Sequence, residues 1–338
     1  MAKALVTGST GFIGSSLIEE LNTLGIEVAA LTRSSSSMKN LEGMQFSRVY
    51  GDLSDRESLE RAIAESGADY IFHLAGVVTA KNRDGFFNAN ADGTRLLAEA
   101  VAKVRPGLSR FVYVSSLAAG GPASADFSPR IETESDAPVS AYGESKLEGE
   151  KYLRNFTDIF PVTIVRPPMV YGPRDPATFV FVQTVARNLI PMVAPSGKTD
   201  HKRYSVVHVR DLVRGIVQAG MVSREQVRSG EVFYLTSDDI VTYQELMTTI
   251  AEAMEKDPFR FRIPVAALKI GAHALDALGR VTGRTYPLNR DKLNEILPDA
   301  WTCSNEEAKK LLGYRPEFSF RAGMQNAVEW YRHAGWIK

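Results

Sequence analysis

The sequence has 338 residues, of which 44% are hydrophobic and 24% are charged, a composition that predicts a folded globular protein with a sizeable core. Its 40 basic and 40 acidic residues balance, so the charge indicates neither a nucleic-acid partner nor an acidic membrane surface. The only cysteine, Cys303, excludes an intrachain disulfide, and we expect no metal centre. The first apolar run ends in glycines instead of a signal-peptide core, which predicts a cytoplasmic protein.

The chain begins with the succession of a strand, a glycine turn and a helix. Residues 2–7, AKALVT, are compatible with a β-strand, and GSTGFIG and the helix-like SSLIEELNTLG follow directly. Gly8 permits a tight turn, Gly11 lets the backbone approach a pyrophosphate, and Gly14 lets the helix lie close to the strand. Unpaired amides at the helix N-terminus favour phosphate, and Gly25 provides a C-cap. This succession predicts a dinucleotide site.

The second expected strand, IEVAALTR at residues 26–33, ends where a dinucleotide-binding protein holds the adenosine ribose. An acidic residue there would accept the 2′-hydroxyl of NAD, whereas a basic residue accommodates the 2′-phosphate of NADP. No acidic residue occurs between Ala29 and Ser37, and Arg33 stands at the strand end. We therefore expect NADP, with NAD as the alternative if Arg33 stacks on adenine or faces solvent.

Strands and helices then alternate as far as Ser116. The expected strands cover residues 46–51, 68–76 and 110–116, and the expected helices cover 55–66 and 84–103. This alternation requires a parallel sheet with helices on both faces, in which ligands bind beyond the carboxyl ends of the strands. Those ends carry Asp52, Ala75 with Gly76, and Ser115 with Ser116, so we expect these residues to meet on one rim.

A tyrosine and a lysine stand four residues apart in the next segment, AYGESKLEGEKYL at residues 141–153. On a helix, the side chains of Tyr142 and Lys146 would lie on the same face. A tyrosine ordinarily titrates near pH ~10, and a cation fixed beside it would bring its pKa toward the working range. The spacing alone is equally typical of an ordinary surface helix, so its meaning depends on the neighbouring motifs.

Several short motifs follow one another in a fixed order. They are TGSTGFIG at the start, GDL at 51–53, HLAG at 73–76, NADGT at 90–94, VSS at 114–116, YGESK at 142–146, RPPMVYGP at 166–173 and VHVRDL at 207–212. In order and spacing they resemble the extended short-chain dehydrogenase/reductase family over the first 211 residues. The resemblance implies a Rossmann-type α/β fold, a doubly wound parallel sheet with helices on both faces, and a small C-terminal α/β substrate lobe.

The resemblance also implies site residues. Tyr142 would be the general acid/base, and Lys146 would hold the nicotinamide ribose while lowering the pKa of the phenol. Ser116 would hydrogen-bond the substrate oxygen, and Asn90 would support the proton relay. The implied cofactor-binding residues are Gly8, Thr10, Gly11, Phe12, Ile13, Gly14, Arg33, Asp52, Leu53, Leu74, Ala75, Gly76, Tyr142, Lys146, Pro167, Met169 and Val170. A homodimer through the helices that carry Asn90 and Tyr142 is implied as well.

Beyond the sixth expected strand, PVTIVRP at residues 161–167, the alternation breaks into proline-rich loops, short strands and helices. The expected pieces are helices near 176–189, from Asp211, and near 242–254, 265–281, 304–311 and 319–333, with strands at 204–209 and 231–236. We place a cofactor-binding domain at residues 1–170 and a substrate-binding lobe at 171–338, some of whose elements return to the sheet.

The longest apolar stretch, residues 263–281, contains four charged or titratable side chains at steps of four, three and four, which are Lys269, His273, Asp276 and Arg280. These steps place them on one helical stripe, so we expect an amphipathic helix and not a membrane span. Contact of this helix with a membrane surface stays open.

Two branches of the resembling family compete. Nucleotide-sugar epimerases and dehydratases carry an asparagine where Met169 stands, and methionine cannot donate to a diphosphate oxygen. Arg203 lies five residues before His208, where those enzymes have a spacing of four. SSLAAGGPA at residues 115–123 and the C-terminal tail look closer to the 3β-hydroxysteroid dehydrogenase-like branch. Met169, Phe179 and Phe181 would suit an apolar substrate, although each is also compatible with ordinary packing.

We therefore expect an NADP-dependent oxidoreductase that interconverts a ketone and a secondary alcohol on a small, apolar molecule. The alternative is a nucleotide-sugar epimerase or dehydratase with tightly bound NAD. A third hypothesis is a protein that binds NADP without turnover, although relatives of that kind usually lack the catalytic tyrosine or lysine, and both are present in this chain.

Overall fold

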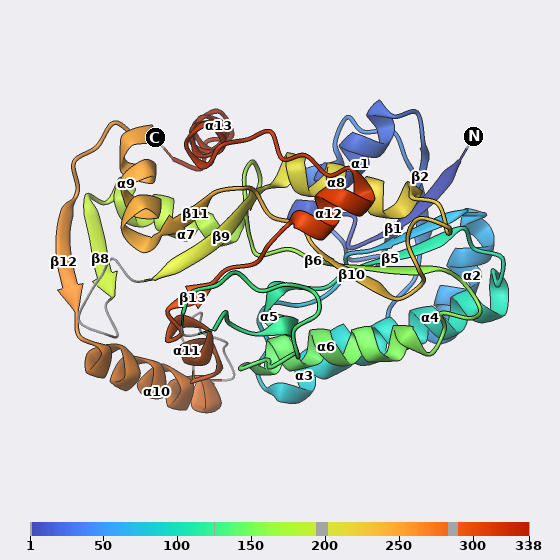
Figure 1. The fold of residues 1–338 in the computed structure, drawn as a ribbon, viewed down its shortest axis with the longest axis horizontal. Coiled ribbons are helices and arrows are strands. Elements are labelled where there is room, and N and C mark those ends of the chain that lie inside the picture. The colour runs from blue at the N-terminus through green and yellow to red at the C-terminus, as the bar shows by residue number, and fades with distance from the viewer. Residues whose placement is uncertain (1, 125, 194–201, 283–289, 338) are drawn as a thin grey trace.

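A seven-stranded parallel sheet forms the centre of the molecule in a computed structural model that describes residues 2–124, 126–193, 202–282 and 290–337 (Figure 1). Its strands in sheet order are β10 (Glu231–Tyr234), β6 (Val162–Arg166), β5 (Arg110–Val114), β4 (Tyr70–His73), β1 (Lys3–Thr7), β2 (Glu27–Thr32) and β3 (Ser47–Tyr50). The strand order reverses direction between β1 and β4, and ligands of such sheets bind at that point. The expected doubly wound parallel sheet is confirmed.

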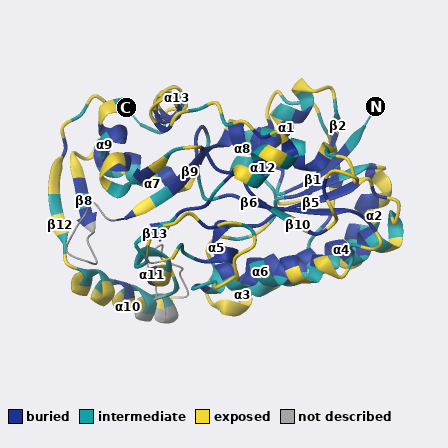
Figure 2. Ribbon diagram, in the orientation of Figure 1, coloured by how far each residue is buried: buried dark blue, intermediate teal, exposed yellow. Residues whose placement is uncertain are grey.

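Helices cover both faces of this sheet. On one face, α1 (Phe12–Thr23), α8 (Val209–Met221) and α12 (Glu306–Leu312) contribute to a core that includes Leu17 and Ile216. On the other face, α2 (Arg56–Ser66), α4 (Gly93–Val104) and α6 (Ala141–Arg154) contribute to a second core that includes Ile63 and Leu153. Because the strands are buried between these two layers, they read as continuous apolar runs in the sequence (Figure 2).

The helix expected at residues 84–103 is interrupted. The structure has α3 (Arg83–Phe87), a π-helical turn η2 (Asn88–Asp92) and then α4. Such turns are frequent at functional sites, and this one contains Asn90. Three short helices of the described residues were also not predicted, which are η1 (Lys39–Leu41), α5 (Leu117–Gly120) and α11 (Arg290–Ile296).

The C-terminal half builds a third core beside the large sheet. Four strands, β7 (Met169–Tyr171), β9 (Arg203–His208), β11 (Ile240–Thr242) and β13 (Ala300–Trp301), form a small sheet, and β8 (Leu189–Val193) pairs with β12 (Phe259–Ile263). The helices α7 (Pro176–Ala186), α9 (Tyr243–Ala253) and α13 (Phe320–His333) pack in the same core. The helix expected near 176–189 ends earlier, because Asn188 has a φ of 59° and β8 begins at Leu189.

The predicted amphipathic helix is α10 (Val265–Thr282), which is followed by α11 (Arg290–Ile296). Ala272 of α10 is buried, whereas Ile270 and Leu278 are exposed on the opposite side. Among the helices that the structure describes, none is long and apolar enough to cross a membrane. Cys303 is a buried free thiol.

Candidate active site

The glycine turn after β1 is built so closely that side chains would not fit. Gly8 has a φ of 67°, and a Cβ there would lie 2.7 Å from the backbone nitrogen of Ala75. A Cβ at Gly14 would overlap the carbonyl group of Gly8, which explains how α1 begins directly over the turn. Gly11 is exposed and is the N-cap of α1 without any side-chain capping bond. The first amides of α1 therefore suit the phosphates of a dinucleotide.

The neighbouring residues of the turn have structural contacts. The backbone carbonyl of Thr10 accepts a hydrogen bond from Asn40 Nδ2 at 3.0 Å, which ties the turn to the segment after β2. Phe12 and Ile13 begin α1, and they pack with Leu74 against the core that α1, α8 and α12 share. These three side chains are therefore partly buried by packing at the rim and do not project from it into solvent.

Arg33 lies directly after β2, at the strand end expected from the sequence, and it is exposed. Hydrogen bonds from the backbone and side chain of Ser54 lower the pKa of Asp52, and the charge of Arg33 contributes to the same shift. Leu53 packs against Gly93 and the second core. Arg33 and Asp52 therefore lie close together at the ends of β2 and β3.

Arg48 is a second cation at this corner, which sequence reasoning missed. Its Nη2 donates to the carbonyl of Arg33 at 3.1 Å, and its Nε donates to Thr32 Oγ1 at 2.8 Å. Its guanidinium also lies 4.5 Å from the centre of the Tyr50 ring. The sequence pattern of β3 did not predict that Arg48 contacts the end of β2, because this contact depends on how the two strands pair.

A buried chain of hydrogen bonds links the first strand to η2. Thr7 Oγ1 lies 2.7 Å from His73 Nδ1, and His73 Nε2 lies 2.9 Å from Thr94 Oγ1. Thr94 Oγ1 in turn donates to the carbonyl of Asn90 at 2.7 Å. Burial lowers the pKa of His73 to about 3, and the charge of Lys146 acts in the same direction, so the imidazole is neutral. This network also escaped the sequence reasoning.

Asn90 joins the loop after β4 to the helix that carries Tyr142. Its Nδ2 donates to the carbonyl of Val77 at 3.0 Å and to Ser145 Oγ at 2.9 Å, and its Oδ1 accepts from the amide of Val77 at 2.8 Å. A Cβ at Gly76 would meet Asn90 Oδ1 at 2.7 Å and Lys146 Nζ at 3.4 Å. Gly76 therefore lies beside both side chains, with Ala75 directly before it in the chain.

Ser116, Tyr142 and Lys146 meet beyond the carboxyl end of β5. Ser116 is the N-cap of α5, and its hydroxyl lies near enough to the phenol of Tyr142 to lower the pKa of that group. Ser140 caps α6 by accepting from the amide of Gly143 at 3.1 Å, so Tyr142 lies in the first turn of that helix. Lys146, one turn later, is buried, and its Nζ donates to the carbonyl of Val114 at 2.8 Å. The arrangement can hold and move a proton at an oxygen near Ser116 and Tyr142.

The expected effect of Lys146 on the phenol is not what the structure shows. Burial raises the pKa of Tyr142 to about 12, the hydroxyl of Ser116 acts in the opposite direction, and the carboxylate of Glu295 adds to the rise. The ammonium of Lys146 donates to the carbonyl of Val114 and lies 4.7 Å from the ring centre of Tyr113, so it is not directed at the phenol of Tyr142. Burial lowers the pKa of Lys146 to about 8, and Glu150 opposes that shift.

The residues after β6 lie mostly inside the protein. Pro167 is buried, and its carbonyl accepts from the amide of Leu117 at 2.9 Å. Met169 and Val170 belong to β7, where Met169 packs on the third core and Val170 on the first. Phe179 lies 4.9 Å from the ring centre of Tyr331, and together with Phe181 it packs in the third core. Packing therefore accounts for both phenylalanines.

Two carboxylates of α11 reach the first turn of α6. Asp291 Oδ1 accepts from the amide of Ala141 at 2.7 Å, and Glu295 Oε1 accepts from Ser140 Oγ at 2.8 Å. No sequence signal could have found these contacts, because about 150 residues separate the partners.

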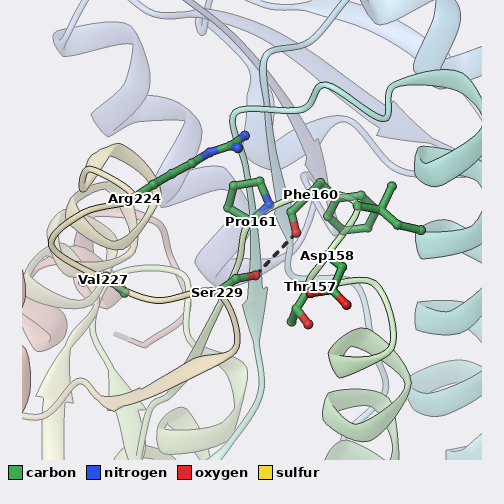
Figure 3. Close-up of a pocket in the computed structure, with 8 residues that line it drawn as sticks. Thr157, Asp158, Phe160, Pro161, Arg224, Val227 and Ser229 are labelled. Carbon is green, nitrogen blue, oxygen red and sulfur yellow. Dashed lines mark hydrogen bonds between the residues drawn. The ribbon is translucent and has the colours of Figure 1, made fainter.

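One pocket lies away from this rim (Figure 3). It has a volume of about 140 Å³ and is lined by Thr157, Asp158, Ile159, Phe160, Pro161, Arg224, Val227 and Ser229. Pro161 directly precedes β6, so the pocket opens at the amino ends of the strands, opposite the site described above. In the described part of the chain, no three His, Cys, Asp or Glu side chains gather as metal ligands.

Comparisons with known proteins agree with this geometry. A model of the NAD-dependent epimerase/dehydratase family matches residues 4–234. The chain is 30% identical to a ceramide reductase of Caulobacter vibrioides over 98% of its own length and 95% of that protein. It is 26% identical to a 4-hydroxy-2-methyl-3-oxo-4-farnesyl-3,4-dihydroquinoline-1-oxide ketoreductase of Stigmatella aurantiaca, covering 95% of this chain and 94% of that protein. A UDP-glucose 4-epimerase of Thermotoga maritima, solved with UDP-glucose, superposes with a TM-score of 0.79 at 25% identity, covering 98% of this chain and 99% of that one.

Proposed function

This chain belongs to the NAD-dependent epimerase/dehydratase family and is an NAD(P)-dependent enzyme of oxidoreductase type, and from that premise we propose that it uses NADP to interconvert a ketone and a secondary alcohol on a small, apolar substrate. The observation that carries the proposal is the meeting of Ser116, Tyr142 and Lys146 on the rim that also holds the glycine turn. A carbonyl oxygen beside Ser116 would be within reach of the phenol.

The chain's own residues supply the proton transfer. A bound nicotinamide supplies or accepts the hydride. Tyr142 donates a proton to the carbonyl oxygen during reduction and takes it back during oxidation, and Ser116 holds that oxygen by donating a hydrogen bond. Lys146 carries the positive charge beside them, and Asn90 connects the site to Ser145 and to the backbone of Val77. The positions of these side chains support the proposed roles.

The glycine turn fits the pyrophosphate of a dinucleotide, and the end of β2 fits a 2′-phosphate. The glycine turn has no room for side chains, the N-terminus of α1 has no side-chain cap, and the first turn of that helix has no acidic residue. At the adenosine end, Arg33 is exposed and Arg48 lies against its carbonyl. The segment from Ala29 to Ser37 contains no acid that would hold the 2′-hydroxyl of NAD. The proposed cofactor is therefore NADP, with NAD as the alternative.

Relatives support an apolar ketone or alcohol. Two of the similar proteins are named for reduction of a ceramide and of a farnesylated ketone, and both names describe lipid-like molecules. The sulfur of Met169 offers no hydrogen bond to a diphosphate, which agrees with that class of substrate. A nucleotide-sugar epimerase or dehydratase remains the second candidate, because the Thermotoga epimerase shares the fold over nearly the whole chain.

Incubation with NADPH or NADH and a panel of apolar ketones tests the proposal. We expect oxidation of NADPH, at least tenfold faster than that of NADH, with one or more ketones. Absence of turnover with every ketone, together with a rise in melting temperature on addition of UDP-glucose, would instead support the epimerase candidate.

Three further expectations stay proposals. We propose a homodimer through the helices that carry Asn90 and Tyr142, which sedimentation at micromolar concentration would test. We also propose the division of the chain into residues 1–170 and 171–338, and a cytoplasmic location.

A protein that binds NADP without turnover would be recognised if Tyr142→Phe left every detectable activity unchanged.

A further inference from the structure

A buried carboxylate lies one helical turn beyond Lys146. Tyr142, Lys146 and Glu150 are spaced four residues apart along α6, so their side chains share one face of the helix. The side chain of Glu150 is 1% exposed. Glu150 has no part in the proton transfer proposed above, yet its position continues the row of catalytic side chains.

Glu150 contacts the ends of two strands of the sheet. Its Oε1 accepts from Ser115 Oγ, at the end of β5, and from Arg166 Nε at 2.9 Å. Its Oε2 accepts from Arg166 Nη2 at 2.6 Å, so the arginine at the end of β6 is held by two bonds. The next residues in the chain are Ser116 and Pro167. One carboxylate therefore fixes α6 to the two strand ends that lead into the site.

Glu150 also carries a negative charge one helical turn beyond Lys146, on the same face of α6. The groups packed around Lys146 come from several elements: His73 of β4, Tyr113 of β5, Tyr142 and Glu150 of α6, and Arg166 of β6 beyond Glu150. His73 is neutral, and burial raises the pKa of Tyr113 and of Tyr142, so both phenols are neutral near pH 7. Within the described residues, Glu150 is the one carboxylate whose charge favours the ammonium form of Lys146.

Arg166 keeps a second carboxylate. Its Nη1 and Nη2 donate to Asp136 at 2.6 and 2.9 Å, and the side chain of Asp136 is 29% exposed. Loss of the Glu150 charge would leave Arg166 paired with Asp136, but Lys146 would lose the carboxylate that favours its ammonium form. The effects of Glu150 on Arg166 and on Lys146 are therefore separable.

We propose that Glu150 is a positioning residue of this enzyme, which seats α6 on the ends of β5 and β6 and keeps Lys146 positively charged at neutral pH. This inference rests on the proposed function, because it assumes that a cationic Lys146 contributes to binding of the dinucleotide. If Glu150 served folding alone, removal of its charge would lower the stability of the protein but leave the pH dependence of NADPH binding unchanged.

The pH dependence of NADPH affinity in the full chain tests this inference, measured by fluorescence titration between pH 6 and 10. We expect wild-type affinity to fall with a midpoint near pH 8, as Lys146 loses its proton. Glu150→Gln keeps the shape of the side chain but removes its charge. Its decline should begin at least one pH unit lower, with affinity several-fold weaker than wild type at pH 7.5.

Asp136→Asn is the matched control, because it removes the other carboxylate of the same arginine. Its titration should coincide with that of the wild type. The inference is wrong if Glu150→Gln keeps the wild-type onset, or if Asp136→Asn shifts it equally. Should Glu150→Gln not fold, Glu150→Asp decides, since it retains the charge: a folded Glu150→Asp with a lowered onset contradicts the inference, and a wild-type onset supports it.

Failure of the proposed function would look different. A wild type that binds NADPH with the expected pH dependence but reduces no ketone would contradict the function while leaving the role of Glu150 supported. Binding of neither NADPH nor NADH at any pH would overturn both.

Discussion

Gly14 shows how one residue can determine whether the glycine turn after β1 forms. A Cβ at Gly14 would overlap the backbone carbonyl of Gly8, and backbone cannot move aside as a flexible side chain does. Gly107, in the loop before β5, has no heavy atom within 4 Å of the place where its Cβ would be. Substitution by alanine should therefore disturb the structure at Gly14 but not at Gly107.

Gly14→Ala should weaken NADPH binding at least tenfold and destabilise the fold by about 1–3 kcal/mol, the usual cost of overpacking. Gly107→Ala should change neither quantity measurably. Fluorescence titration and denaturant unfolding measure the two effects. Equal behaviour of the two variants would mean that the close contact over Gly8 is not required.

Tyr142 should be needed for catalysis but not for binding. Tyr142→Phe removes the proton donor and keeps the ring, so kcat for ketone reduction should fall by about 10²–10⁴-fold, while the Kd of NADPH changes less than about twofold. Tyr152→Phe, on the same helix beside Arg95, is the control and should retain full activity. A Tyr142→Phe enzyme with wild-type kcat would remove Tyr142 from the mechanism.

At the scale of elements, α11 connects the C-terminal half to the catalytic helix. Its carboxylates Asp291 and Glu295 accept hydrogen bonds from the N-terminal turn of α6. Lys202 donates to the carbonyl groups of Leu297 and Pro298, which directly follow α11. Burial is the main cause of the raised pKa of Tyr142, and Glu295 adds to it from this helix. Through Glu295, this helix of the C-terminal half therefore influences the pKa of Tyr142.

Glu295→Gln should lower the pKa of Tyr142, because the neutral amide no longer opposes formation of the phenolate. Alcohol oxidation requires the deprotonated phenol, so the rising part of the pH profile of kcat/KM should move to lower pH by a fraction of a unit. Glu307→Gln on α12, whose partner is Lys310, should leave the profile unchanged. A shift of the Glu295→Gln profile to higher pH would contradict this assignment.

At the scale of the whole molecule, the C-terminal half completes the sheet that binds the cofactor. The strand β10 pairs with β6, and α8 contributes Leu212 and Ile216 to the same core as Phe72. Gly220 of α8 lies so close that a Cβ would be 2.7 Å from the Phe72 ring. The proposed boundary at residue 170 therefore does not separate two independent cores.

A chain that ends at residue 170 should not fold, because it lacks β10 and two of the three helices that cover one face of the sheet, α8 and α12. We expect no cooperative thermal transition and no NADPH binding from this fragment by circular dichroism and fluorescence. A fragment 1–170 that unfolds cooperatively and binds NADPH would show that the first domain is autonomous.

The extent to which sequence predicted this protein depends on how local each feature is. The turn from Gly8 to Gly14 and the row of Tyr142 and Lys146 were readable, because strand, turn and helix chemistry act over a few residues. The π turn at Asn90 was not readable, since it is accompanied by bonds to Val77 and to Ser145, 13 and 55 residues away.

Glu150 falls between these cases. Its position four residues after Lys146 was visible in YGESKLEGE, but its partners Ser115 and Arg166 come from two strands.

The lowered pKa expected for Tyr142 was wrong for a related reason. Spacing placed Lys146 on the correct face, but only the packed structure shows that its ammonium is directed at Val114.

The most direct test of the central claim follows the hydride itself. The enzyme is incubated with an apolar ketone that it turns over and with NADPH carrying deuterium at the transferable position, and the product is examined by mass spectrometry. A ketone reductase should yield an alcohol with one deuterium at the carbinol carbon, and Tyr142→Phe should yield almost none. If no deuterium enters any ketone, while UDP-glucose is converted to its epimer without uptake of label, the chain is an epimerase and not a ketone reductase.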